Sequence, residues 1–268
     1  MTLARQTMSG GLWSLLANGG QQALNFAFFV YLARLLDPSA FGLVALALVF
    51  VDVALPLGRL GLVEVAIRES DLDDGFVNRI FWLLAALGGG LTLALALAAH
   101  PIAAVFGHPE LAPVVLALAP VCLLQNLAAV PEARLQRAFG YKALTGRTLL
   151  GASIGGGVGL AAALTGFGVW ALVLQKLVTV LVQVVVLWAS GGWLPKAPVL
   201  RLAEDVRRGL RMGLDILASN LMNLLNTKLM DVLIGLFWGV AELGWFRTAW
   251  KIFEILIYCT VYPLASVA

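Results

Sequence analysis

The sequence predicts an all-α, polytopic transmembrane helical bundle, and three observations lead to this fold class. First, 61% of the 268 residues are hydrophobic and only 12% are charged, whereas soluble domains have about 45–50% apolar and about 25% charged residues. Second, the mean hydropathy is +0.93. Third, about eight apolar runs approach the ~20 residues that a helix needs to cross a bilayer. None of these runs alternates with the period of two that is typical of a membrane β-barrel.

Each run is expected to form one membrane-spanning helix, because a helix satisfies its own backbone hydrogen bonds inside lipid. In chain order the expected spans are 13–36, 41–63, 80–99, 111–130, 149–167, 168–190, 212–236 and 243–261. The fifth span carries Gly151, Gly155 and Gly159, a doubled small-residue motif that indicates close packing against a neighbouring helix.

The basic residues predict how the bundle is oriented. If the N-terminus is cytoplasmic, the opposite side carries only Arg34. The cytoplasmic side then carries Arg5, Arg59, Arg68, Arg79, Arg134, Arg137, Lys142, Arg147, Lys196, Arg201, Arg207, Arg208 and Arg211. This asymmetry follows the positive-inside rule. It predicts a multi-pass protein of the inner (plasma) membrane.

Several classes of function are not supported. Cys122 and Cys259 lie inside apolar runs and are interpreted as packing residues, and His100 and His108 have no neighbouring ligand cluster, so no metal site is expected. No nucleophile with a matching base indicates an enzyme. No dense tract of Lys and Arg indicates nucleic-acid binding.

An internal repeat is indicated at an offset of 202 residues, which places Asn220 against Asn18 and Glu254 against Asp52. Polar residues are rare at membrane depth, so these matches carry more weight than the accompanying apolar ones. Both copies start on the same side, which predicts a parallel repeat. We therefore expect residues 1–211 to form a six-helix lobe and residues 212–268 to form the first two helices of an incomplete second lobe.

Polar residues inside the spans are the candidates for function. The first span carries Asn18, Gln21 and Asn25 on one face, and the seventh repeats this pattern with Asn220 and Asn223. Such amides could line a cavity or could form hydrogen bonds between helices, and the pattern leaves both interpretations open.

Charged residues are concentrated in the last two spans. Arg247, Lys251 and Glu254 share one helix face, and Lys228 and Asp231 are spaced for pairing on the preceding helix. One interpretation is a mutually neutralised network. The other is a cavity for an anionic substrate, since these three cations outnumber the two anions. Lys176 on the sixth span could join this cavity or extend its side chain to the membrane surface.

Three stretches, 31–47, 59–64 and 233–249, resemble Wzx-type polysaccharide flippases of the multidrug/oligosaccharidyl-lipid/polysaccharide superfamily. This resemblance implies two six-helix lobes and no enzymatic chemistry. It implies that the substrate is an undecaprenyl-pyrophosphate-linked oligosaccharide for lipopolysaccharide, exopolysaccharide or capsule. Membrane lipids and other polysaccharide-assembly membrane proteins would be its partners.

Transport is expected to proceed by alternating access without a cofactor. Coupling to a proton or sodium gradient would require a carboxylate near the cavity, for which Asp52, Asp231 and Glu254 are the candidates. The alternatives are a multidrug exporter of the same superfamily, a membrane glycosyltransferase or polymerase, and a non-transporting membrane subunit.

Overall fold

The computed structural model describes the backbone of residues 3–60, 63, 74–138, 140–191, 193–196 and 204–265. Side-chain surroundings are described for residues 19–60, 63, 75–138, 140, 142–190, 193–196 and 217–254. Within these ranges the regular secondary structure is entirely helical, which confirms the predicted all-α class. The helices are α1 (Leu3–Leu35), α2 (Pro38–Arg59), α4 (Asp74–Phe106), α5 (Leu111–Leu118), α6 (Pro120–Arg137), α7 (Tyr141–Leu164), α8 (Val169–Gly191), α9 (Glu204–Phe237) and α10 (Val240–Ala265).

The expected spans coincide with these helices, except that the fourth is divided into α5 and α6. The division falls at Ala119, immediately before Pro120. Proline has no backbone N–H and cannot donate the next helical hydrogen bond. The helix is therefore interrupted at this point, and α6 continues in the direction of α5. Across the described residues, five helical segments are long and apolar enough to cross a membrane: Pro38–Arg59, Gly75–Phe106, Leu111–Arg137, Lys142–Leu164 and Val169–Ser190. The chain is a multi-pass membrane protein; the number of eight spans stays a prediction.

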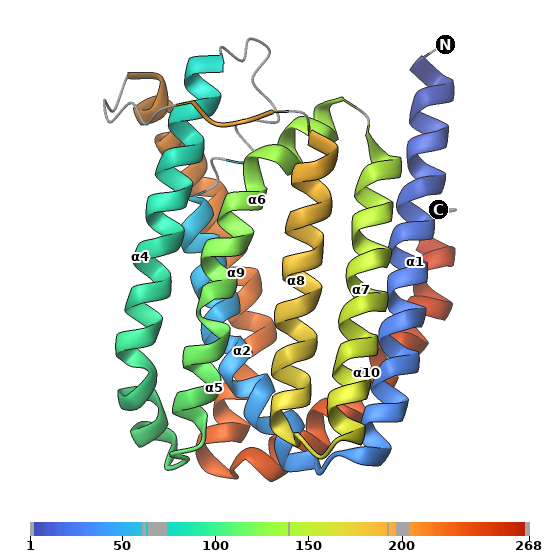
Figure 1. The fold of residues 1–268 in the computed structure, drawn as a ribbon, viewed down its shortest axis with the longest axis vertical. Coiled ribbons are helices and arrows are strands. Elements are labelled where there is room, and N and C mark those ends of the chain that lie inside the picture. The colour runs from blue at the N-terminus through green and yellow to red at the C-terminus, as the bar shows by residue number, and fades with distance from the viewer. Residues whose placement is uncertain are drawn as a thin grey trace.

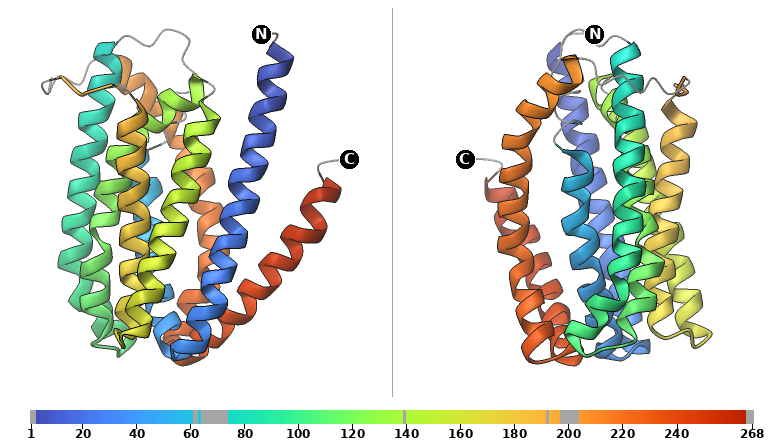
Figure 2. Two further views of the ribbon diagram at one scale, coloured as in Figure 1. Left: turned by 45° about the vertical axis from the view of Figure 1, so that its right-hand side comes forward. Right: turned by 90° about the vertical axis from the view of Figure 1, so that its left-hand side faces the viewer.

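The long helices run side by side as a bundle (Figure 1). Helix α2 is central, because it packs against α4, α5, α6, α8, α9 and α10. Helix α1 packs mainly on α7, which packs in turn on α8. Helices α1 and α10 lie close together at the end of the bundle where α2 begins, and they diverge toward the chain termini (Figure 2).

The three glycines of α7 provide the close helix contact that the sequence predicts. A Cβ atom on Gly151 would lie 2.6 Å from Cγ of Gln183, and one on Gly159 would lie 2.7 Å from Cβ of Gln175. Both partners belong to α8. The glycines therefore allow the α7 backbone to approach α8 more closely than any other residue would permit.

Gly155→Ala should lower the thermal stability of the bundle. Its new Cβ would lie 1.9 Å from Oγ1 of Thr179 and 2.8 Å from the backbone oxygen of Gln175, and overpacking of this kind costs about 1–3 kcal/mol. The control is Gly157→Ala, since no atom lies within 4 Å of a Cβ at Gly157. Melting of the detergent-purified variants measures the difference. Equal melting temperatures would show that the α7–α8 contact is not tightly packed.

A second close contact joins α2 to α10. A Cβ on Gly42 would lie 1.7 Å from the backbone oxygen of Val240, and a Cβ on Gly244 would lie 1.8 Å from the backbone oxygen of Pro38. Gly244 stands opposite Gly42 in the predicted repeat, and Val240 stands opposite Pro38. The contact is therefore reciprocal: Gly42 meets Val240, and the repeat equivalent of Gly42, Gly244, meets the repeat equivalent of Val240, Pro38.

Candidate functional site

A polar, half-open cavity lies between α1, α2, α8, α9 and α10. Its volume is about 510 Å³, which is within the usual range of about 300–1,000 Å³ for small-molecule sites. Its polar lining residues are Gln21, Asn25, Gln175, Lys176, Thr179, Lys228, Arg247, Lys251 and Glu254. Its apolar lining residues are Phe29, Leu32, Phe41, Val44, Ala45, Leu48, Leu172 and Trp250.

The structure brings together most residues that the sequence singles out for a cavity. Helix α1 contributes Gln21 and Asn25, and α8 contributes Lys176. Helices α9 and α10 contribute the remaining cations, Lys228 from the first and Arg247 and Lys251 from the second. These side chains come from segments far apart in the chain and line one volume.

Two of the predicted cavity residues, Asn220 and Asn223, do not line this cavity. The side chain of a third, Asn18, is outside the described residues. Asn220 and Asn223 are exposed on α9. Asn223 precedes Lys228 by five residues, which places it about 140° around the helix. Because Lys228 points into the cavity, Asn223 points away from it. The assignment of these two amides to a substrate cavity therefore stays a prediction.

Three ion pairs stand in or beside the cavity. Nζ of Lys228 lies 2.7 Å from Oδ2 of Asp52, and Nζ of Lys251 lies 2.8 Å from Oε2 of Glu254. In the third, Nη2 of Arg247 donates to Oδ2 of Asp231, whose side chain is only 1% exposed.

These contacts correct the expected pairing of Lys228 with Asp231 within α9. Lys228 reaches across to Asp52 on α2, while Asp231 turns to Arg247 on α10. The two residues share a helix face by spacing, but α2 and α10 both pack against α9 and each supplies one of the partners. Interhelical pairing therefore replaces the local pair.

The balance of charges around the cavity also differs from the three cations and two anions that the sequence analysis counted. Once Asp52 is counted, Lys228, Arg247 and Lys251 each have a carboxylate partner. The three cations do not outnumber their anions, and the network is mutually neutralised. The surplus positive charge belongs instead to Lys176, which has no hydrogen-bond or ion-pair partner among the described residues.

Sequence reasoning did not select Gln175 or Trp250, both of which line the cavity. Gln175 is the residue before Lys176 in an otherwise apolar run, so its polarity was the available signal. Trp250 gave no comparable signal, because tryptophan is common in apolar spans and at membrane interfaces.

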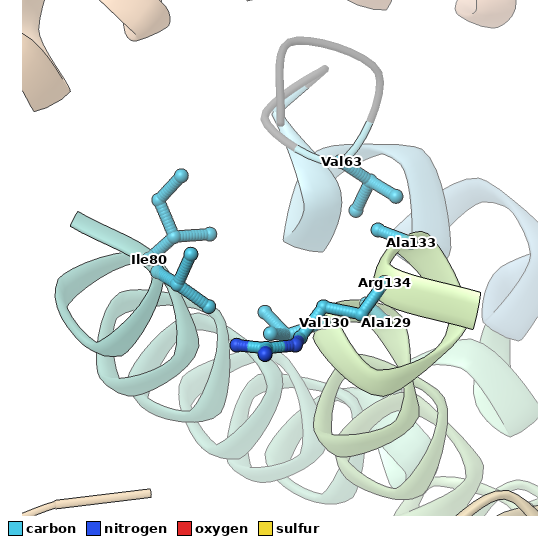
Figure 3. A pocket seen from close by; sticks show the side chains of 7 residues that line it. Val63, Ile80, Ala129, Val130, Ala133 and Arg134 are labelled. Carbon is cyan, nitrogen blue, oxygen red and sulfur yellow. The ribbon is translucent and has the colours of Figure 1, made fainter. Parts of the chain in front are cut away.

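A second hollow lies between α4 and α6 and is not a candidate site. It is lined by apolar residues and by Arg134, as Figure 3 shows. Its volume is about 10 Å³, which holds no more than one water molecule. The guanidinium of Arg134 also lies 5.6 Å from the centre of the Trp193 ring, in the range of a cation–π contact.

Comparison with known proteins yields one family and two curated relatives. The family described as "Polysaccharide biosynthesis protein" matches residues 31–268. The succinoglycan biosynthesis transport protein ExoT of Rhizobium meliloti (strain 1021) is 28% identical over 240 residues, which are 88% of this chain and 48% of ExoT. The lipopolysaccharide biosynthesis protein WzxC of Escherichia coli (strain K12) is 25% identical over 263 residues, which are 94% of this chain and 51% of WzxC. The chain thus spans about half the length of these relatives. No solved structure gives a significant match.

Proposed function

Because the chain belongs to the polysaccharide biosynthesis protein family, we propose that it is a membrane flippase, or a part of one, for lipid-linked oligosaccharides. The observation that carries the proposal is the polar cavity of about 510 Å³ inside an apolar bundle. The printed names of the relatives, a succinoglycan transport protein and a lipopolysaccharide biosynthesis protein, agree with this role.

The physical problem of such transport is the head group. Moving several hydroxyls and phosphates through hydrocarbon leaves polar groups without hydrogen bonds, at a cost of several kcal/mol each. Amides from α1 and charged groups from α8, α9 and α10 offer replacement partners inside the membrane. The lipid tail would stay in the bilayer, and no covalent step is required.

We propose alternating access of two lobes, with residues 1–211 forming the first and residues 212–268 beginning the second. The reciprocal contact of Gly42 with Val240 and of Gly244 with Pro38 supports this division. A parallel pseudo-twofold axis between α2 and α10 would generate such a pair of equivalent contacts.

The distribution of basic residues favours the inner membrane and a cytoplasmic N-terminus. A proton or sodium gradient is the proposed energy source, with Asp52, Asp231 and Glu254 as coupling candidates. Each of these carboxylates is held by a cation. Coupling would therefore have to proceed by exchange within an ion pair. The proposed substrate is an undecaprenyl-pyrophosphate-linked oligosaccharide.

Export is the direct test. The chain is expressed in a bacterium that lacks its own oligosaccharide flippase, and surface polysaccharide is measured. We expect the wild-type chain, together with any residues that continue its second lobe, to support export, and the double variant Arg247→Gln with Lys251→Gln to abolish it while still inserting in the membrane. Wild-type export by the double variant would contradict a head-group role for these residues.

A second variant avoids the ion pairs. Gln21→Leu with Asn25→Leu removes the amides of α1 from the cavity and should also reduce export strongly. Lys142→Gln is the control, because Lys142 is exposed at the start of α7, outside the cavity. Unchanged export in the amide variant would exclude the α1 wall from the substrate path.

A further inference from the structure

A short strap, residues 193–196, crosses one end of the bundle between α8 and α9. It lies where the two proposed lobes join. Figure 1 shows this connection running from the end of α8 toward α4. Segments that connect helices usually lie on the surface and are more mobile than the helices themselves, whereas this strap is fastened to the bundle by its backbone and by a ring.

The backbone of Lys196 is held by two side chains of α4. Its N–H donates to Oδ1 of Asn78 at 2.9 Å, and its carbonyl oxygen accepts from Nε1 of Trp82 at 2.8 Å. Asn78 and Trp82 are four residues apart, so they lie one above the other on the same face of the helix. One helix face thus satisfies both backbone polar groups of one strap residue. We call this arrangement the clasp.

Asn78 is only 4% exposed. Burying an amide is unfavourable unless it forms hydrogen bonds, and Oδ1 of Asn78 is committed to the strap. The amide therefore lies inside the bundle with an acceptor directed at a segment 118 residues further along the chain. Local helix chemistry gives no reason for a buried amide at this position, but the strap does.

The ring of Trp193 docks the other end of the strap. Its centre lies 5.6 Å from that of Phe81 on α4 and 6.3 Å from that of Trp188 on α8, and the guanidinium of Arg134 on α6 lies 5.6 Å away. Aromatic pairs and cation–π contacts at such distances are favourable. Three helices of the first lobe therefore hold the strap.

Helix α4 also packs against α9. It thus contacts the chain on both sides of the join, the strap before it and α9 after it. Opening the clasp would break two hydrogen bonds and leave the buried amide of Asn78 without the strap, which is unfavourable. The contacts therefore favour a clasp that stays closed and fixes where the chain leaves the first lobe.

We propose that the clasp is a permanent anchor, which remains closed throughout transport and fixes the point from which the second lobe begins. Asn78 and Trp82 are then positioning residues. They act through the placement of α9, whose Lys228 lines the cavity. The role in transport rests on the proposed function, whereas the closed clasp does not. The opposite mechanism is a latch that opens in each transport cycle.

Hydrogen exchange tests whether the clasp is closed. The detergent-purified chain is placed in D2O, and exchange at the Lys196 amide is followed by mass spectrometry. We expect exchange about tenfold slower than in Asn78→Ala, which removes the acceptor, and several-fold slower than in Trp82→Phe, which keeps a ring but loses the indole N–H. Ser190→Ala is the matched control, because it removes a 2.8 Å hydrogen bond to the Val186 oxygen within α8 and leaves the clasp intact.

A covalent clasp separates an anchor from a latch. Asn78→Cys is combined with Lys196→Cys in a chain whose Cys122 and Cys259 are replaced by alanine, and export is measured in cells with and without a short, membrane-permeant bifunctional thiol reagent. We expect the unjoined pair to export several-fold less than the cysteine-free parent, and joining to restore at least half of the parent level. The same reagent should leave export by the parent unchanged.

Three results would overturn the anchor. Loss of export on joining would show a latch that opens in each cycle. Equal exchange at the Lys196 amide in the wild type and Asn78→Ala would show that the clasp is not closed. Full export by Asn78→Ala would show that the clasp positions nothing. The exchange measurement needs no transport, so a protected Lys196 amide in a chain that does not export removes the flippase role and leaves the clasp.

Discussion

Gly42→Ala and Gly244→Ala are each expected to lower the melting temperature of the protein by roughly 6–12 °C. The reason is the contact between α2 and α10, where either new Cβ would lie within 1.8 Å of a backbone oxygen. A backbone atom cannot rotate away as a side chain can, so the two helices must separate. We estimate about 3 kcal/mol or more for each variant, at the upper end of overpacking costs.

The effects of the two variants should be similar, because the contacts are reciprocal. They should also extend to α9, since α10 and α9 both pack against α2. Gly90→Ala is the matched control, because nothing lies within 4 Å of a Cβ at that position. Thermal unfolding of the purified variants and limited proteolysis near α9 measure the result. A loss in one variant without the other would contradict the reciprocal geometry.

Asp231→Ala is expected to have the second large effect. Asp231 is buried at 1% exposure and holds the guanidinium of Arg247. Removing one partner of a buried ion pair leaves an uncompensated charge, at a cost of about 3–5 kcal/mol. Thermal unfolding should show a clear loss of stability. Asp231→Leu combined with Arg247→Leu should recover most of it, because neither charge is then left alone.

Glu254→Ala is the control for this prediction. Glu254 also pairs with a cation, Lys251, but its side chain is 41% exposed. Ion pairs of this kind contribute about 0–1 kcal/mol, so the variant should be nearly as stable as the wild type. Similar losses in Asp231→Ala and Glu254→Ala would show that burial does not set the strength of these pairs.

The helical bundle could be predicted from the sequence, because continuous apolar runs leave the backbone few alternatives inside lipid. The division of the fourth span at Pro120 was not expected, although it has a local cause, the missing backbone N–H of proline. Close packing of α7 against a neighbouring helix was also indicated, since small residues spaced four apart permit close approach; the structure shows that this neighbour is α8. These features depend on residues near one another in the chain.

The pairing of charges could not be predicted in the same way. Spacing placed Lys228 and Asp231 on one helix face, yet Lys228 pairs with Asp52 and Asp231 with Arg247. Both contacts cross between helices, so they depend on which helix packs where. The surplus charge of Lys176 follows from these tertiary contacts too, and the spacing of residues within a single helix carries no information about them.

Water access to the cavity tests the central claim most directly. Single cysteines are introduced by Gln21→Cys, Asn25→Cys and, as a lipid-facing control, Leu93→Cys, with Cys122 and Cys259 replaced by alanine. Leu93 is 61% exposed on α4 and outside the cavity. A membrane-impermeant thiol reagent is applied to vesicles of both orientations. The account predicts rapid labelling at positions 21 and 25 and little at 93; equal labelling at all three, or none at 21 and 25, would contradict it.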